Sequence, residues 1–319
     1  MTMITRSLVR TRTIQTLFAY YQCGDKTPTT ARKELLRSFS DTYSLYMVLL
    51  DFVNELTTYA QNQITEMEQR ARFTHKVFTP NRRFADNRFA LQVFENRMLR
   101  HYVDAQHLSW EAGQSAVEAV YNQLMSMPFY QDYLKAEDCT YEDDKAIWRK
   151  ICTELLPDNS ELSAGLEELE IALDEQNWQT DLDYVLSFVV KTIRRFREEN
   201  GADQELLQMF DHEDELQFAQ DLLMRSIEHR EECLELIHGH LKNWTADRLA
   251  FMDVVILQTA LTEIMYFPEI ALEVSLNEYI ELAKDYSGDK SYIFINGILN
   301  EILHDLKRQN KLLKAMTIR

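Results

Sequence analysis

Apolar residues recur every three or four positions through the last third of the chain, which is the spacing of one buried helix face. From residue 246 to 267 this face comprises Leu249, Met252, Val255, Ile256, Thr259, Ala260, Ile264 and Met265. Thr245 stands where a helix N-cap is expected, and Pro268 stands where the helix must end. The pattern therefore predicts an amphipathic helix over this stretch.

Two more helices are predicted directly after it. Ser275 and Glu278 have the spacing of a capping box, and Gly288 suits the left-handed residue that ends a helix. A third helix is predicted from Lys290 to Leu306, with Gly297 letting a neighbouring helix approach. The connections are short, so the three helices are expected to pack on one another.

Helical spacing continues through the rest of the chain. An amphipathic helix is predicted from Thr5 to Gln22, and one long helix from Asp214 to Leu241. Between them, helices are predicted to about residue 39 and over 41–72, 111–127, 142–155, 162–173 and 181–199. With 7 Gly and 5 Pro in 319 residues, turn-forming residues are too few for a many-stranded fold. The predicted fold class is all-α.

Composition narrows the chemistry. Cys23, Cys139, Cys152 and Cys233 have no paired spacing, so neither a zinc site nor a disulfide framework is indicated. No apolar run approaches the roughly 20 residues that cross a bilayer, and no signal peptide is evident. We therefore expect a cytoplasmic protein with no membrane association. Phosphate-cradling motifs such as G-x-x-x-x-G-K-[ST] and G-x-G-x-x-G are missing from the sequence, and no cofactor is expected.

The net charge of −18 argues against nucleic acid, because phosphate binding needs a positive surface, but the charges are unevenly distributed. Both ends of the chain are basic. Residues 70–100 hold eight Lys or Arg against two acids, whereas residues 137–175 hold thirteen acids against three bases. In the basic stretch, Phe84, Phe89 and Phe94 alternate with arginines, which suits either a single-stranded RNA clamp or, as we prefer, inward-facing rings on a solvated helix.

A metal-dependent enzyme is the remote alternative. Two Glu-x-x-His pairs, Glu235 with His238 and Glu301 with His304, follow Glu213 and Glu263 in the order that carboxylate-bridged di-iron bundles use. Ligands in a bundle core must point inward, yet both pairs fall on polar helix faces. We therefore expect no metal site, no catalytic residue and no enzymatic activity.

Three segments carry a family resemblance: DRLAFMDVVILQTALTEIMYF, SLNEYIELAKDYS and KSYIFINGIL. Their order and spacing resemble the C-terminal half of the NusB family of bacterial transcription antitermination factors. The resemblance covers residues 201–308 well and 5–22 plausibly. It implies a NusB-like helical bundle formed by residues 1–24 and 201–319, with the N-terminal helix packed on the C-terminal helices. Residues 25–200 are then an inserted helical region of unknown role.

The resemblance also implies a function. A NusB-like protein would bind a boxA-type single-stranded RNA of rRNA leader transcripts together with ribosomal protein S10/NusE, and hold it to the transcription elongation complex. The runner-up is a NusB-like scaffold that binds only protein, which the acidic surface favours.

The RNA-binding residues that the resemblance implies lie in the first and last helices. They are Arg6, Arg10, Arg12, Gln15, Lys290, Ser291, Tyr292, Phe294 and Asn296. Lys290 and Ile293 depart from the family pattern, which leaves base preference open. From the residues alone, the three arginines also fit an ordinary solvated helix face. On the RNA reading, replacing Arg6 and Arg10 with Ala is expected to weaken RNA binding with little effect on unfolding.

Overall fold

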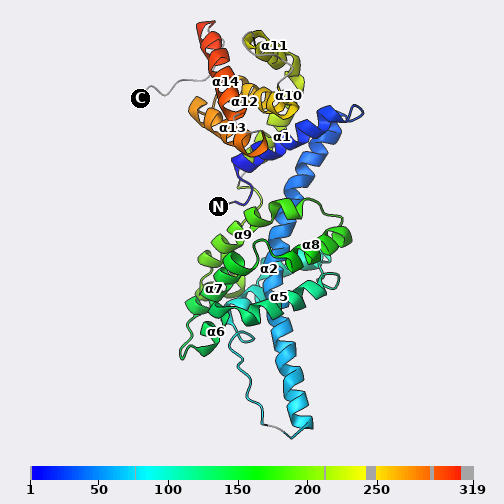
Figure 1. The fold of residues 1–319 in the computed structure, drawn as a ribbon, viewed down its shortest axis with the longest axis vertical. Helices are drawn as coiled ribbons and strands as arrows, with labels where there is room; N and C mark the ends of the chain where they lie inside the picture. The colour runs from blue at the N-terminus through cyan, green and yellow to red at the C-terminus, as the bar shows by residue number, and fades with distance from the viewer. Residues whose placement is uncertain (1, 76, 212, 242–248, 288–290, 310–319) are drawn as a thin grey trace. The chain divides into compact units, whose positions relative to one another are not determined.

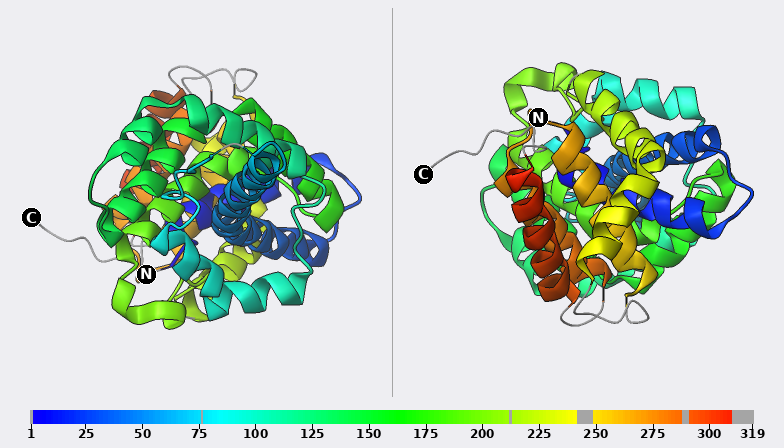
Figure 2. Two further views of the ribbon diagram at one scale, coloured as in Figure 1. Left: turned by 90° about the horizontal axis from the view of Figure 1, so that it is seen from below. Right: turned by 90° about the horizontal axis from the view of Figure 1, so that it is seen from above.

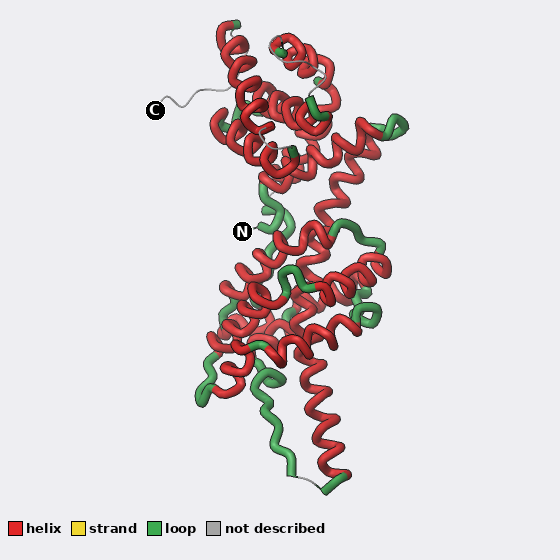
Figure 3. The backbone as a smooth tube through the Cα atoms, viewed as in Figure 1, coloured by secondary structure: helices red, strands yellow, loops and turns green. Residues whose placement is uncertain are grey.

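The computed structural model describes residues 2–75, 77–211, 213–241, 249–287 and 291–309. Helices and the loops between them make up this part of the chain, and it holds no β-strand beyond isolated bridge residues (Figures 1 and 3). The all-α prediction is confirmed. None of the described helices is both long and apolar enough to cross a membrane.

The chain divides into two compact units. Unit 1 holds residues 38–209, and unit 2 holds residues 2–37 and 210–319. Helix α2 (Pro28–Phe73) contributes to both, because the division falls between Arg37 and Ser38. Thr27 begins this helix by accepting a hydrogen bond from the backbone N–H of Thr30 at 3.2 Å.

Unit 1 is a set of shorter helices around the later part of α2. They are α3 (Arg88–Glu95), α4 (Arg97–Gln106), α5 (Gln114–Ser126), α6 (Pro128–Lys135), α7 (Tyr141–Lys150), the π-helical turn η1 (Ile151–Leu155), α8 (Ser160–Leu173), α9 (Trp178–Arg195) and the 3-10 segment η2 (Glu198–Asp203). Large aromatic side chains fill the core, among them Trp148 and Trp178, which are buried. The Trp178 indole N–H donates to the Asp41 carbonyl at 3.0 Å, so its polar group is satisfied.

Unit 2 is built around one helix that is buried on nearly every side. It comprises α1 (Arg6–Gln22), α10 (Glu213–Glu228), α11 (Arg230–His240), α12 (Phe251–Tyr266), α13 (Leu272–Tyr286) and α14 (Ser291–Arg308). Helix α12 contacts all five of the others. Helix α13 packs against α14, as the neighbouring orange and red helices in the right-hand view of Figure 2 show. A helix that is apolar all round is the expected centre of such a bundle. The prediction that the N-terminal helix packs with the C-terminal helices is confirmed.

Four local predictions are corrected. Helix α2 has no break at residues 40–41, because no Gly or Pro interrupts its apolar spacing there. The predicted helix over 214–241 ends at Glu228 and restarts at Arg230, where the ring of His229 stacks on Tyr266 with centroids 3.9 Å apart.

The other two corrections concern small residues of the last helices. Helix α13 begins at Leu272, so Ser275 lies inside its first turns and does not cap it. A Cβ on Gly297 would meet nothing within 4 Å, so this glycine accommodates no neighbouring helix. The predicted cap at Thr245 and the predicted helix end at Gly288 fall outside the described residues.

Candidate nucleic-acid interface

Helix α1 carries four of the predicted RNA-binding residues. Thr5 caps it by accepting from the Leu8 N–H at 3.2 Å, and the helix packs against α10 and α12. These two neighbours cover more of α1 than a single apolar stripe would suggest. As a result, Arg10 and Arg12 are buried, whereas Arg6 is exposed.

Arg10 forms a buried ion pair with Glu263 of α12. The Arg10 Nε donates to Glu263 Oε2 at 2.8 Å, and Nη2 donates to Oε1 at 2.9 Å, so the pair is bidentate. The two side chains are 2% and 0% exposed. Arg10 Nη1 also lies 3.4 Å from Glu278 Oε2 on α13. A guanidinium held in this way joins α1, α12 and α13, and it is not presented to a phosphate.

Two hydroxyl groups also donate hydrogen bonds to the Glu263 carboxylate. Ser275 donates to Oε1 at 2.7 Å, and Tyr279 donates to Oε2 at 3.0 Å. Burial lowers the pKa of Arg10, but the hydrogen bonds and charge of Glu263 outweigh it and leave that pKa above its ordinary value. Burial also raises the pKa of Tyr279 well above its ordinary value, so the phenol stays protonated and donates. This polar cluster is a structural element of unit 2.

Arg6 and the Arg12–Gln15 pair have different environments. The Arg6 guanidinium lies over the ring of Phe218, 5.2 Å from its centroid, on an exposed part of α1. Arg12 donates to Gln15 Oε1 at 3.0 Å, and Gln15 Nε2 donates to the Tyr286 hydroxyl at 3.2 Å. Gln15 therefore connects α1 to the last turn of α13.

The same end of α13 contacts the first turn of α14. Lys284 Nζ lies 5.5 Å from the centroid of the Tyr292 ring. Tyr292 is 36% exposed, and its neighbour Ile293 is 55% exposed. Ser291 and Phe294 are partly exposed. The predicted residues Gln15 and Tyr292 thus contact the same end of α13, Gln15 through Tyr286 and Tyr292 through Lys284. Residues two apart on a helix do not face the same side, so the two contacts lie on different sides of α13.

The remaining predicted residues are less closely tied to this place. Asn296 is exposed, and it accepts a hydrogen bond from Asn300 Nδ2 at 2.9 Å along the surface of α14. Lys290 falls outside the described residues.

The phenylalanines of the predicted arginine-rich clamp in unit 1 do not form a platform. Phe84 and Phe89 are buried, and only Phe94 is exposed. Phe84 packs on Trp148 with ring centroids 5.3 Å apart, and Phe89 packs on Phe196 at 5.1 Å. This is the inward-facing arrangement that the sequence also allowed.

The residues of the di-iron alternative do not converge. Glu263 is fully engaged by Arg10, and the pairs at 235/238 and 301/304 are exposed. Among the described residues, no group of three or more His, Cys, Asp and Glu side chains is arranged to hold a metal ion.

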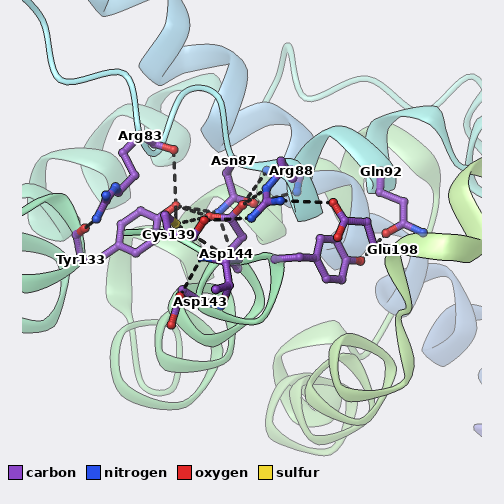
Figure 4. Close-up of polar contacts among 12 residues, drawn as sticks. Arg83, Asn87, Arg88, Gln92, Tyr133, Cys139, Asp143, Asp144 and Glu198 are labelled. Carbon is purple, nitrogen blue, oxygen red and sulfur yellow. Dashed lines mark hydrogen bonds and ion pairs between the residues drawn. The ribbon is translucent and has the colours of Figure 1, made fainter. Parts of the chain in front are cut away.

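A second buried carboxylate, Asp144, organises part of unit 1 (Figure 4). Its Oδ1 accepts from the Tyr133 hydroxyl at 2.7 Å and from the Cys139 thiol at 3.0 Å. Its Oδ2 accepts from the Arg88 backbone N–H at 3.0 Å. Burial and the hydrogen bond to Asp144 raise the pKa of Cys139 above its ordinary value. A thiol kept protonated is a poor nucleophile, and the Asp144 carboxylate joins the start of α3 to Tyr133 and Cys139.

Comparisons with known proteins match the C-terminal part of the chain. The NusB family model matches residues 186–304. The transcription antitermination protein NusB of Bacillus velezensis is 44% identical over 90 residues, which are 28% of this chain and 69% of that protein. The protein of the same name from Finegoldia magna is 38% identical over 92 residues, 29% of this chain and 67% of that protein. This chain belongs to the NusB family. The comparison with solved structures gave no match.

The matched NusB segment starts inside α9 and ends near the end of α14. It includes Glu263, Ser275 and Tyr279, but not Arg10 or the rest of α1. Helix α1 lies outside the matched segment, but the structure places it in the same unit, because it packs on α10 and α12.

Three residues at this end of the NusB-like unit, Lys284, Tyr286 and Phe251, were not singled out from the sequence. Lys284 and Tyr286 are within the NEYIELAKDYS motif, but their helical spacing does not say that they face α14 and α1. Phe251, 36% exposed, packs on Phe18 of α1 with ring centroids 5.3 Å apart. Neither aromatic residue has a pattern that distinguishes it from an ordinary core position. The end of α13, together with the residues of α1 and α14 that contact it, is called the α1/α13/α14 surface below.

Proposed function

We propose that this NusB-family protein is a transcription antitermination factor that acts by binding single-stranded RNA, not by catalysis. The relatives named transcription antitermination proteins support the general role. The observation that supports RNA as the ligand is the pairing of an exposed ring, Tyr292, with the cation of Lys284 on the α1/α13/α14 surface.

The chemistry of this surface suits a single strand. An exposed aromatic ring can stack on an unpaired base, and stacking contributes about 1–3 kcal/mol per base. The ammonium of Lys284 pairs with exposed Glu281 at 2.6 Å, and it can exchange that partner for the adjoining phosphate. The Gln15 amide and the Asn296 amide are side chains of the kind that hydrogen-bond to base edges. Arg6 supplies an exposed positive charge on α1.

We assign Arg10 a positioning role in this function. It is buried against Glu263, so it fixes α1 against α12 and α13 and thereby holds Gln15 opposite Tyr286. Arg12, also buried, orients Gln15 from the same helix.

The specific ligand follows from the family resemblance. We propose that the RNA is a boxA-type element of an rRNA leader, bound jointly with ribosomal protein S10/NusE. The pair would hold the nascent RNA to the elongating polymerase in the cytoplasm, so that transcription continues past terminators. Residues 1–24 and 201–319 would carry this activity, and residues 25–200 would be an addition to it.

A protein-binding scaffold remains the second candidate, and the charge of α11 favours it. Glu231, Glu232 and Glu235 are exposed on this helix, which suits a basic protein partner better than RNA. The two functions differ in what the α1/α13/α14 surface does.

Fluorescence anisotropy with a labelled boxA-type RNA tests the proposal. We expect Tyr292→Ala and Lys284→Gln each to weaken binding by about tenfold, the loss of one stacked base or one charged contact. Val274→Ala and Lys307→Gln are matched controls, because both residues are exposed on the same two helices away from this surface. Parent protein that binds the RNA no better than an unrelated oligonucleotide, with or without the ribosomal protein, would refute the RNA proposal and favour the scaffold.

A further inference from the structure

The end of helix α9 in unit 1 carries a dense group of positive charges. Residues 191–197 contain Lys191, Arg194, Arg195 and Arg197 and no acid, in a chain whose net charge is −18. Lys191, Arg194 and Arg195 have the spacing that places residues on one face of a helix. Arg197 follows just after the helix ends. These four residues are called the α9 basic surface.

Most of these cations have no acidic partner. Arg194 and Arg195 are exposed, and no ion pair to a described residue forms at either guanidinium. Lys191 Nζ lies 3.9 Å from the centroid of the Phe188 ring, a contact that leaves its charge uncompensated. Arg197 is 73% exposed and forms a long ion pair with Glu199, 4.0 Å from Nη1 to Oε1. By contrast, Arg88 and Arg97 on α3 and α4 both form ion pairs.

Two pockets adjoin this surface, and Arg194 lines both. The larger has a volume of about 760 Å³ and is lined by Arg194, Arg195, Arg197, Asn200, Gln204 and two acids. Of these acids, Asp203 is already paired with Arg97 at 2.8 Å, which leaves Glu205. The smaller pocket has a volume of about 410 Å³ and includes Lys191 and Asp183.

The loop of the larger pocket is held in shape from within. Gln204, which is buried, accepts from the Arg197 backbone N–H at 3.0 Å and from Asn200 Nδ2 at 2.8 Å. Gln92 of α3 donates to the carbonyls of Arg197 and Gly201, both at 2.9 Å. The arginines therefore project from a fixed backbone, which reduces the entropy lost when they bind a ligand.

The negative end of the α9 dipole explains why cations are favourable near its last turn. It does not explain why three of them, Lys191, Arg194 and Arg195, form no ion pair with a described residue in so acidic a chain. Guanidinium groups bind the paired oxygens of a phosphate, and a row of such groups fits consecutive phosphates of a flexible strand.

We propose that the α9 basic surface is a second RNA-binding surface, which takes the phosphodiester backbone of single-stranded RNA beside the element bound by unit 2. This inference rests on the RNA-binding function proposed above, and it assigns unit 1 a part in that function. It gives the surface no base preference, because arginine and lysine contacts to phosphate do not read sequence.

The test compares two labelled RNAs on the full chain: a short boxA-type RNA, and the same RNA extended by twenty uridines. The variant is Lys191→Gln, Arg194→Gln and Arg195→Gln combined. The control combines Arg70→Gln, Arg72→Gln and Lys135→Gln, which removes the same charge from exposed positions elsewhere in unit 1. Thermal melts followed by circular dichroism verify that both variants are folded.

We expect the α9 variant to bind the short RNA like the parent and the extended RNA about fiftyfold more weakly at 0.15 M salt. Each lost phosphate contact changes the slope of log K against log salt by about 0.7, so three contacts change it by about 2. Equal affinity and slope for variant and parent on the extended RNA would overturn the inference, as would an equal loss in the control. Parent protein that fails to bind the short RNA refutes the proposed unit 2 site instead.

Two further measurements use the parent protein and do not depend on variants that fold. Extended RNA carrying 4-thiouridine in its tail should crosslink on irradiation to peptides that contain residues 191–205. Crosslinks confined to other peptides would contradict the proposal. Poly-glutamate at equal charge should displace the extended RNA poorly from the protein. If it displaces the labelled RNA as well as unlabelled RNA does, the surface selects negative charge alone, and the proposal is contradicted.

Discussion

Removing the Glu263 carboxylate should destabilise unit 2 strongly. In the Glu263→Ala variant, the Arg10 guanidinium stays buried without its bidentate partner, and the hydroxyls of Ser275 and Tyr279 lose their acceptor. Removing one partner of a buried ion pair costs about 3–5 kcal/mol. Each buried hydroxyl without an acceptor adds about 1 kcal/mol where it finds no substitute.

The expected shift in melting temperature follows from the size of the unit. Unit 2 comprises residues 2–37 and 210–319, and in a unit of about 150 residues 1 kcal/mol corresponds to roughly 2–4 °C. We therefore expect the transition of unit 2 to fall by about 10 °C or more. Circular dichroism melts and urea titrations measure it. Glu269→Ala is the control, because this carboxylate is exposed in the same unit and its removal should cost less than about 0.5 kcal/mol.

A double replacement distinguishes the loss of the Arg10–Glu263 ion pair from a general effect of substitution at these two buried positions. Arg10→Met combined with Glu263→Leu removes both charges and keeps similar volumes, so much of the lost stability should return. The reasoning is refuted if Glu263→Ala melts within about 1 °C of the parent. It is also refuted if the double variant is less stable than both Arg10→Met and Glu263→Leu alone. The structure argues against the expectation that replacing Arg10 hardly changes unfolding, because this guanidinium is 2% exposed and is paired with Glu263.

Further predictions concern thiols and glycines. Burial raises the pKa of Cys152 to about 12 and that of Cys233 to about 11, so neither thiolate forms near pH 8. A thiol reagent should therefore label the exposed Cys23 first. Rapid labelling of all four cysteines without denaturant would contradict this prediction. Gly165→Ala should destabilise unit 1 by about 1–3 kcal/mol, because its Cβ would lie 2.3 Å from that of Ala116. Gly297→Ala should instead stabilise α14 by up to about 1 kcal/mol, since its Cβ meets open space; opposite signs in urea titrations are the required result.

The spacing of apolar residues was sufficient to predict most helices of both units, because a helix buried on one face records that face every three or four positions. This spacing did not predict which residues are buried where a helix is covered on more than one side. Arg10 looked solvated, since a charged residue off the apolar stripe of a helix usually is. Its partner Glu263 is 253 residues away in the chain, and no local pattern links them.

Two local signals were real but had another use. Ser275 and Glu278 have capping-box spacing, yet both serve the Arg10 cluster, Ser275 through Glu263 and Glu278 through Arg10 itself. The start of α13 at Leu272 was hidden, because Ala271 at its N-cap offers no side-chain hydrogen bond to reveal it.

For the candidate site, the sequence pointed to Tyr292 through the family resemblance. It did not distinguish Lys284 and Tyr286 from other positions of their helix, because the residues that face a third helix are set by tertiary packing. The α9 basic surface was missed for a similar reason. Its charges are visible in the sequence, but which of them lack an acidic partner is a property of the folded unit, in which Arg197 pairs with Glu199.

The pairing of Arg10 with Glu263 also imposes an order on biosynthesis. At about 5–20 residues per second, the ribosome adds the 253 residues between them in roughly 13–50 seconds. Residues 38–209 are complete during that interval and have the contacts to fold as they emerge. Helix α1 can pack on α10 once residue 228 has emerged, but Arg10 must wait for its partner until α12 leaves the exit tunnel. A chain arrested before residue 263 therefore leaves the Arg10 guanidinium without its carboxylate partner, which is the form in which chaperones and proteases would meet it.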